Sequence, residues 1–188
     1  MTVPFRDAAE LEAGGTAAYL RITPGRTRSE RLAGLLQLNA KGEPVEFAFS
    51  TVQIPSGALW KAGQAERGGL RSLTTSLFQA SQRTPLLLLC LAREVPPDLF
   101  RDELEVLLPV CRLAAETDVA ELDRGEVAEL AELAAEPAIH LFWRPGPPAP
   151  ESPARRLLDL LARRGFLLEP FERIPAGLHE ALSAATVQ

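Results

Sequence analysis

The sequence predicts an α/β protein, with an α+β arrangement left open, in which a mixed sheet of about four to six strands precedes a helical C-terminal appendage. Three stretches support this prediction. Residues 32–55 have the pattern of two apolar strands joined by a polar turn, residues 65–82 have the spacing of an amphipathic helix, and residues 85–92 contain no polar residue. Their β-β-α-β order favours a mixed sheet in which the helix is the crossover connection.

The β-hairpin within residues 32–55 is the element that the sequence specifies best. Asn39 and Gly42 lie in its turn and tolerate a positive φ. From Val45 onwards apolar residues alternate with polar or small ones, as in a strand with one buried face. The phase of this alternation changes before Val52, so we expect a β-bulge near Ser50-Thr51.

Short elements account for most of the remaining chain. We expect strands over residues 17–22, 85–92, 109–114 and 138–143, and helices over residues 65–82, 98–105, 126–135, 152–164 and 175–185. Asp98 is placed to cap its helix. Pro109 favours a strand, because proline inside a helix costs about 3 kcal/mol. Residues 166–174 are apolar and are expected to be extended or irregular.

Four prolines within residues 145–150 predict a stiff, extended linker. We therefore divide the chain into a lead-in (1–15), a mixed α/β domain (16–144), a proline-rich linker (145–151) and a C-terminal helical subdomain (152–188). In the last of these, Leu157, Leu158 and Leu161 form an apolar helix face. We expect this face to be an interaction surface that docks either on the domain or on a partner.

Charge is distributed unevenly along the 188 residues. The net charge is −5, but residues 1–94 carry +3 and residues 95–188 carry −8. This asymmetry argues against a nucleic-acid surface over the whole protein, since strong phosphate binding requires a concentrated basic face. The densest basic cluster, and the candidate binding site, consists of Arg21, Arg26, Arg28 and Arg31. It is interpreted either as a solvated loop or as a contact for phosphate or an acidic partner.

Catalytic motifs are missing from the sequence. It contains no phosphate-binding glycine motif and no C-x-x-C, H-E-x-x-H or G-x-S-x-G pattern. The best carboxylate pair for catalysis joins Glu46 with Asp98 or Asp102, and Glu46 is equally explained as the solvent-facing residue of a strand. His140 is expected to be a core or edge histidine. We predict no catalytic residues, no metal site and no cofactor.

The acids Glu126, Glu129 and Glu132 are three residues apart and would share one face of the expected helix. Three such carboxylates, without a histidine at helical spacing, are typical of a solvated face rather than a metal site. Two cysteines, Cys90 and Cys111, lie in apolar runs and are expected to be buried and reduced.

The chain is expected to be cytoplasmic. Its longest strongly apolar run, residues 85–92, is far shorter than the roughly 20 residues that span a membrane. The first 15 residues lack the basic start and apolar core of a signal peptide. No membrane contact is therefore expected.

Two segments carry a family resemblance, GLLQLNAKGEPVEFAFSTVQIP (34–55) and LLEPFERIPAGLHEAL (167–182). They resemble an uncharacterised bacterial family whose members share a Gly-Leu-Leu…Asn…Gly-x-Pro-x-Glu-Phe hairpin and a C-terminal Glu-Pro-Phe-x-Arg. No activity or catalytic residue is assigned to that family. The resemblance implies a bacterial cytosolic protein with a hairpin-led α/β fold.

From these observations we expect a non-catalytic protein-interaction or accessory subunit of a bacterial cytosolic complex. Its partner would be another protein or a second copy of the chain. One alternative is a nucleic-acid-associated factor that uses the arginine cluster. Another is a small-molecule binder or enzyme with an unrecognised site at the edge of the sheet.

Overall fold

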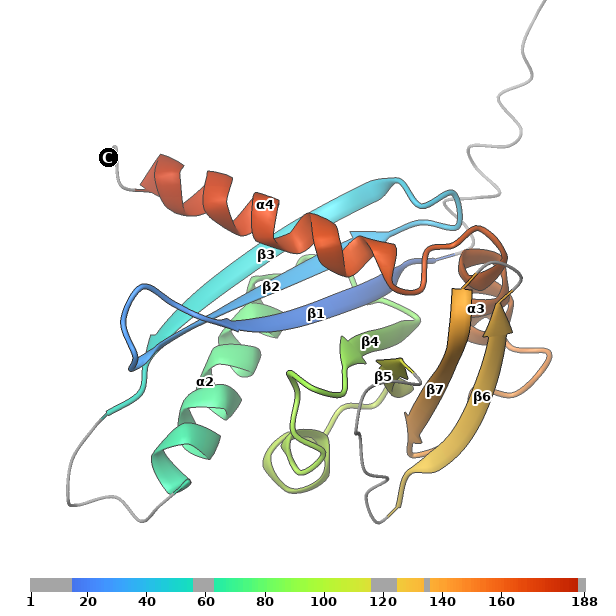
Figure 1. Cartoon of the computed structure of the whole chain (residues 1–188), viewed down its shortest axis with the longest axis horizontal. Helices are drawn as coiled ribbons and strands as arrows, with labels where there is room; N and C mark the ends of the chain where they lie inside the picture. Colours follow the sequence, from blue (N-terminus) through green and yellow to red (C-terminus); the bar gives the residue numbers. More distant parts are fainter. Residues whose placement is uncertain (1–14, 56–62, 116–124, 134–135, 186–188) are drawn as a thin grey trace, which may run out of the picture.

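The computed structural model describes residues 15–55, 63–115, 125–133 and 136–185, and Figure 1 shows its arrangement. Its core is a seven-stranded mixed sheet in the order β3-β2-β1-β4-β5-β7-β6. The strands are β1 (Ala17–Pro24), β2 (Glu30–Leu38), β3 (Pro44–Gln53), β4 (Leu87–Leu91), β5 (Val110–Ala115), β6 (Val127–Leu133) and β7 (Glu136–Arg144). The helices are α2 (Gln64–Ala80), the π-helical turn η1 (Leu99–Glu103), α3 (Pro153–Arg163) and α4 (Glu169–Ala185).

The sheet combines parallel and antiparallel pairs, so the predicted α/β class with a mixed sheet is confirmed. β1 is antiparallel to β2 and parallel to β4, while β4 is parallel to β5. β7 is antiparallel to both β5 and β6. The sheet has more strands than the four to six expected, because β6 lies where a helix was predicted.

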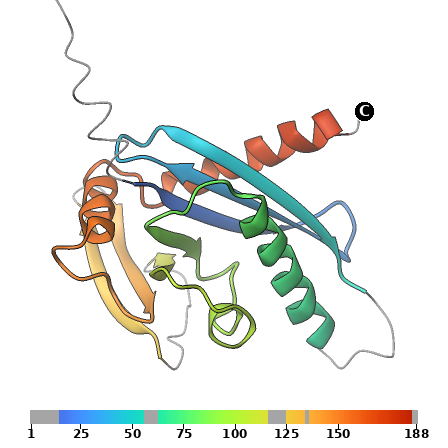
Figure 2. The same cartoon turned by 180° about the vertical axis from the view of Figure 1, so that it is seen from behind.

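Helices cover both faces of the sheet (Figures 1 and 2). Leu70, Leu73 and Leu77 of α2 pack with one set of buried strand residues, whereas α3 and α4 pack with the other. Within β4, Leu88 faces the α2 side and Leu89 the opposite side, and both are at most 1% exposed. This two-sided burial is the reason that β4 is apolar throughout.

The helix predicted over residues 126–135 was wrong, because Val127–Leu133 form strand β6. β6 pairs with β7, with Val127 opposite Trp143. From this strand Glu129 accepts hydrogen bonds from the indole Nε1 of Trp143 at 2.9 Å and from the guanidinium of Arg155 at 2.7 Å. These contacts with distant parts of the chain outweigh the local helix propensity of the sequence.

The bulge predicted near Ser50-Thr51 was also misplaced. The β2–β3 register is regular there and shifts instead between Gln37 and Leu38. The change of phase has another cause: Phe47 packs against the α4 side of the sheet, whereas Val52 packs against the α2 side. Because helices cover both faces of the sheet, β3 needs apolar side chains on both of its faces.

Two helix boundaries differ from the prediction. Asp98 makes no side-chain cap, and the helix expected after it is only the short turn η1. α4 starts at Glu169, within the stretch expected to be irregular, and contains Pro175. Proline has no N–H, so the carbonyl of Phe171, four residues earlier, is left without its helical donor.

None of the described helices is long and apolar enough to cross a membrane.

Candidate functional site

The parallel strands β1, β4 and β5 end on one side of the sheet, which we call the carboxyl-end edge. Leu20 of β1 lies opposite Cys90 of β4, and Leu91 lies opposite Leu113 of β5, so the three strands finish close together. Ligands of open α/β sheets bind outside the carboxyl ends of the strands. The carboxyl-end edge is therefore where a ligand site is expected.

Three neighbouring hollows lie along the carboxyl-end edge, with volumes of about 260, 580 and 370 Å³. Arg93 lines both the first and the second hollow, and Glu66 lines both the second and the third. Their charged lining residues are Arg21, Arg93 and Glu172 in the first, Glu66, Arg67, Arg93, Glu94 and Asp98 in the second, and Arg28, Arg31 and Glu66 in the third. Together we call them the edge groove.

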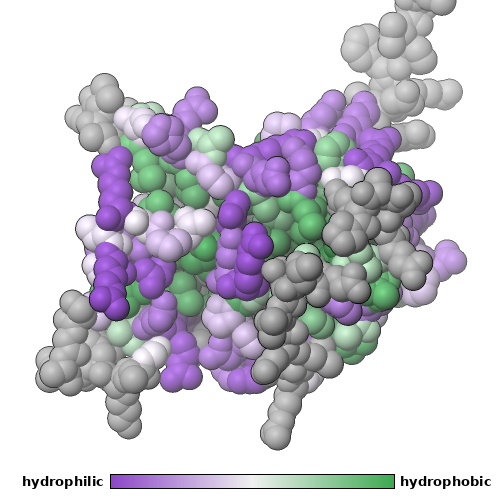
Figure 3. Space-filling view, viewed as in Figure 1, coloured by the Kyte–Doolittle hydropathy of each residue, from purple (hydrophilic) through white to green (hydrophobic). Residues whose placement is uncertain are grey.

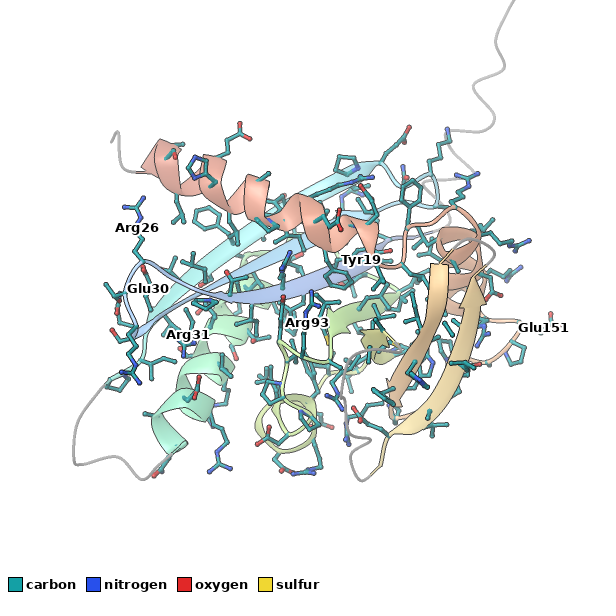
Figure 4. The ribbon with its side chains drawn as sticks, viewed as in Figure 1. Tyr19, Arg26, Glu30, Arg31, Arg93 and Glu151 are labelled. Carbon is teal, nitrogen blue, oxygen red and sulfur yellow. The ribbon has the colours of Figure 1, made fainter. Side chains whose placement is uncertain are left out.

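The figures show how the charged residues near the groove are arranged. In Figure 4, Arg26, Glu30 and Arg31 surround the β1–β2 turn, and Arg93 lies between this turn and Tyr19. Figure 3, drawn from the same direction, shows hydrophilic side chains on the left of this face, with apolar surface between them. Charged groups from segments far apart in the sequence thus lie along one edge.

Arg21 is held at the first hollow by two contacts. Its Nε donates to Glu94 Oε1 at 3.0 Å, and its Nη1 donates to the carbonyl of Phe171 at 2.8 Å. This is the carbonyl that Pro175 leaves without a helical donor. The side chains of Arg21 and Glu94 are 20% and 14% exposed. Glu94 Oε2 is buried and has no hydrogen-bond partner among the described residues.

The other arginines of the groove differ in how firmly they are held. Arg31 Nη2 donates to Glu66 Oε1 at 3.0 Å, and Arg67 lies 3.9 Å from Asp98. The exposed side chain of Arg28 forms no ion pair within the ranges that the structure describes. A groove of this kind presents guanidinium groups to an anion, while several of its carboxylates are already paired.

The β1–β2 turn is built to hold two arginines outwards. Gly25 N donates to the Glu30 carbonyl at 2.9 Å, and Arg26 N donates to Glu30 Oε2 at 2.6 Å. The Glu30 carboxylate fills the space where a Cβ on Gly25 would lie. The side chains of Arg26 and Arg28 consequently project into solvent.

The structure divides the arginine cluster that the sequence predicted. Arg26, Arg28 and Arg31 lie at the β1–β2 turn, whereas Arg21 lies within β1 and lines the first hollow. They lie toward the same end of the strands but on different faces of the sheet, since Arg21 contacts Phe171 of α4 and Arg31 contacts Glu66 of α2. Sequence reasoning missed Arg93 as a member, although a charged residue directly after a buried strand is a signal that points to such an edge.

The apolar helix face predicted for interaction is covered by the chain itself. Leu157, Leu158 and Leu161 are 2%, 2% and 0% exposed and belong to the core between α3, α4 and the sheet. Of the two docking modes expected, the structure shows docking on the domain.

The structure does not bring Glu46 and Asp98, the best carboxylate pair considered for catalysis, together. Glu46 accepts hydrogen bonds from the backbone N–H groups of Gln82 and Arg83, at 2.7 and 3.1 Å, before the start of β4. Asp98 follows the end of β4 and lines the second hollow. Because β4 separates them, Glu46 lies at the end of the sheet where β4 begins and Asp98 lies at the end where β4 finishes.

The other titratable residues considered, His140, Glu126 and Glu129, contact neighbouring side chains of the fold. His140 lies in β7 with its ring stacked on Phe142, at a centroid distance of 6.2 Å. Glu126 and Glu129 do not share a face, because three residues along a strand reverse the side: Glu126 pairs with Arg112, and Glu129 with Arg155. The described residues include no group of three His, Cys, Asp or Glu side chains placed to hold a metal ion.

The fold resembles two solved structures. The endonuclease V of Streptomyces avermitilis aligns with a TM-score of 0.54 at 15% identity, covering 98% of this chain and 96% of that one. The endonuclease V of Bacillus subtilis aligns with a TM-score of 0.56 at 12% identity, covering 93% of this chain and 84% of that one. No family model and no curated protein matches the sequence. At this identity the similarity is one of fold.

Proposed function

We propose that this protein associates with nucleic acid and holds the phosphodiester backbone along the edge groove. The observation that carries the proposal is the set of arginines that line three neighbouring hollows between the β1–β2 turn and the end of β4, namely Arg21, Arg28, Arg31, Arg67 and Arg93. Backbone binding depends on guanidinium and ammonium groups that replace the counterions of the phosphates.

The charges of the groove support this choice of ligand. Glu66 pairs with Arg31 and Glu94 pairs with Arg21. These two acids therefore neutralise part of the positive charge of the groove and leave the other arginines facing it. Arg26 and Arg28 project from the turn into solvent and are placed to meet successive phosphates. The net charge of −5 restricts such binding to this edge.

The fold similarity gives independent support. The two similar structures are of proteins named endonuclease V, and an endonuclease acts on nucleic acid. For the present chain we propose a binding role, because arginines line the groove while its carboxylate Glu94 is paired with Arg21. This keeps the interpretation of a non-catalytic accessory subunit in a bacterial cytosolic complex, and the resemblance to an uncharacterised bacterial family remains part of the proposal.

The experiment is a fluorescence-anisotropy titration with labelled single-stranded and duplex DNA and RNA at several salt concentrations. The site variant is R26A/R28A/R93A, which removes two arginines that line the groove, Arg28 and Arg93, and the exposed Arg26 of the adjoining turn. The matched control, K41A/R156A/R163A, also removes three positive charges from exposed positions, none of which lines the edge groove. Circular dichroism checks that each variant is folded.

We expect measurable binding at low salt that weakens as salt rises. The site variant should bind about tenfold more weakly or worse, and its plot of log K against log salt should lose about two to three units of slope. The control should stay within about twofold of the unmodified protein. Equal losses in both variants, or no binding of any probe at low salt, would overturn the proposal.

A further inference from the structure

An apolar pocket of about 210 Å³ lies at the opposite edge of the sheet, where β4 begins. It is formed by the end of α2, the segment leading into β4 and the segment leading into β5, which lie on one side of the molecule in Figure 2. Its apolar lining includes Phe78, Pro85, Leu88, Val106 and Leu108. A smaller apolar cavity, of about 150 Å³, holds a benzene ring, so the volume suffices for a branched aliphatic side chain.

Leu107 stands beside this pocket and is 96% exposed, whereas the other large apolar side chains described as exposed are 36–53% exposed. Its neighbours Val106 and Leu108 both line the pocket. Residues 106–108 therefore carry both a fully exposed leucine and part of the wall of an apolar pocket. Leaving a leucine fully in water is unfavourable relative to burying it.

We propose that this surface binds a second copy of the chain, with Leu107 of each copy inserted into the pocket of the other. A projection and a hole on the same segment are self-complementary about a two-fold axis, which is the commonest symmetry of protein dimers. The edge groove lies at the other edge of the sheet, so the dimer leaves it open.

Charge complementarity selects a second copy over an unrelated apolar partner. Arg83 lines the pocket, and Glu105 precedes Val106 on the projecting segment. Both side chains are exposed, and neither forms an ion pair or side-chain hydrogen bond within the described ranges. When Leu107 enters the facing pocket, Glu105 of that copy meets Arg83 of the other, and the two-fold axis makes this pair twice.

The patch is small beside a typical stable interface of about 1,600 Å². We therefore expect a weak dimer that forms reversibly as concentration rises. The measurement is sedimentation velocity on the full chain, from low micromolar to near-millimolar concentration, for the unmodified protein, L107D, R83E, E105R and R83E/E105R. The matched control is L160D, because Leu160 is a leucine that is 37% exposed on α3 and does not line the pocket. Circular dichroism checks that every variant is folded.

The unmodified chain should shift from monomer to dimer across this range. L107D should weaken dimerisation about tenfold or more, while L160D should not change it. R83E and E105R should each weaken the dimer, and R83E/E105R should restore it because the pair is only reversed. A chain that stays monomeric throughout, a dimer unaffected by L107D, or failure of the reversed pair to restore association would overturn the proposal. A monomer that carries a small apolar ligand in native mass spectrometry would overturn it as well.

Discussion

Arg21 donates a 2.8 Å hydrogen bond from Nη1 to the carbonyl of Phe171, across 150 residues of sequence. In an uninterrupted helix this carbonyl would accept the N–H four residues later, but that residue is Pro175. The proline thus frees an acceptor for an arginine of the sheet. The same guanidinium pairs with Glu94, so it joins the end of β1 to the segment after β4 and to α4.

Replacement of Arg21 by alanine should destabilise the fold. It leaves Glu94 Oε1 and the Phe171 carbonyl without their donor, and we expect a loss of about 1–3 kcal/mol in the free energy of unfolding. Urea denaturation measures this loss. Arg26→Ala, on an exposed arginine, is the control and should change stability by less than about 0.5 kcal/mol. Arg21→Lys should recover only part of the loss, because an ammonium lacks the planar fork that reaches both acceptors. Equal stability of R21A and R26A would contradict this role.

Glu126→Ala should destabilise the fold more than Arg21→Ala does, because Arg112, the partner of Glu126, is buried. Glu126 accepts two hydrogen bonds of 2.7 Å from Arg112, and the two side chains are 2% and 4% exposed. Removing one member of such a pair leaves a buried charge and costs about 3–5 kcal/mol. Glu180→Ala, on an exposed acid of α4, is the control for thermal unfolding.

An apolar replacement of the whole pair separates the cost of an unpaired charge from the value of the ion pair. Arg112→Met combined with Glu126→Leu should be clearly more stable than E126A alone, because neither buried charge remains. If the double variant unfolds as early as E126A, the destabilisation has a different origin.

Two adjacent glycines of α2 should respond oppositely to alanine. A Cβ on Gly68 meets nothing within 4 Å, so Gly68→Ala should stabilise the helix by up to about 1 kcal/mol. A Cβ on Gly69 would come within 2.9 Å of Ile54 Cγ1, and this crowding should remove or reverse the gain. Thermal unfolding of the two single variants compares them directly. Equal stabilisation by both would show that Ile54 moves aside freely.

The two thiols should be unreactive in the folded protein. Cys90 and Cys111 are both 0% exposed, and burial raises the pKa of each thiol above its ordinary value. They face opposite sides of the sheet, which prevents a disulfide between them. A thiol reagent at mildly alkaline pH should label neither cysteine until denaturant is added. Rapid labelling of the folded chain would contradict this expectation.

The same raised pKa values predict a loss of stability in alkali. Below the ordinary cysteine pKa of about 8.5, both thiols keep their protons in the folded and unfolded chains and add no pH dependence. Above it the unfolded chain releases these protons first, so the free energy of unfolding falls as pH rises. Replacing Cys90 and Cys111 by alanine should flatten this fall relative to the parent protein, as measured by denaturation at increasing pH.

Local patterns predicted much of the fold. The turn residues Asn39 and Gly42 and the leucine stripe of α2 depend on neighbours in the sequence, and both elements form as expected. The apolar run of β4 predicted a strand covered on both faces, and it is buried throughout. Ser152 caps α3 by accepting a hydrogen bond from the N–H of Arg155. In each case hydrophobic periodicity or turn and cap chemistry acts within a few residues.

The sequence by itself determined the α/β class, the hairpin, the buried central strand and the basic turn with Arg26, Arg28 and Arg31. Only the tertiary structure decided that residues 127–133 form a strand, since a helix-prone segment becomes β6 when β7 offers it a paired edge. Only the tertiary structure joined Arg21 to Glu94, 73 residues away, and placed Arg93 in the edge groove. The physical reason is that a site at the ends of parallel strands is assembled by crossover connections, which bring together residues that no local pattern relates.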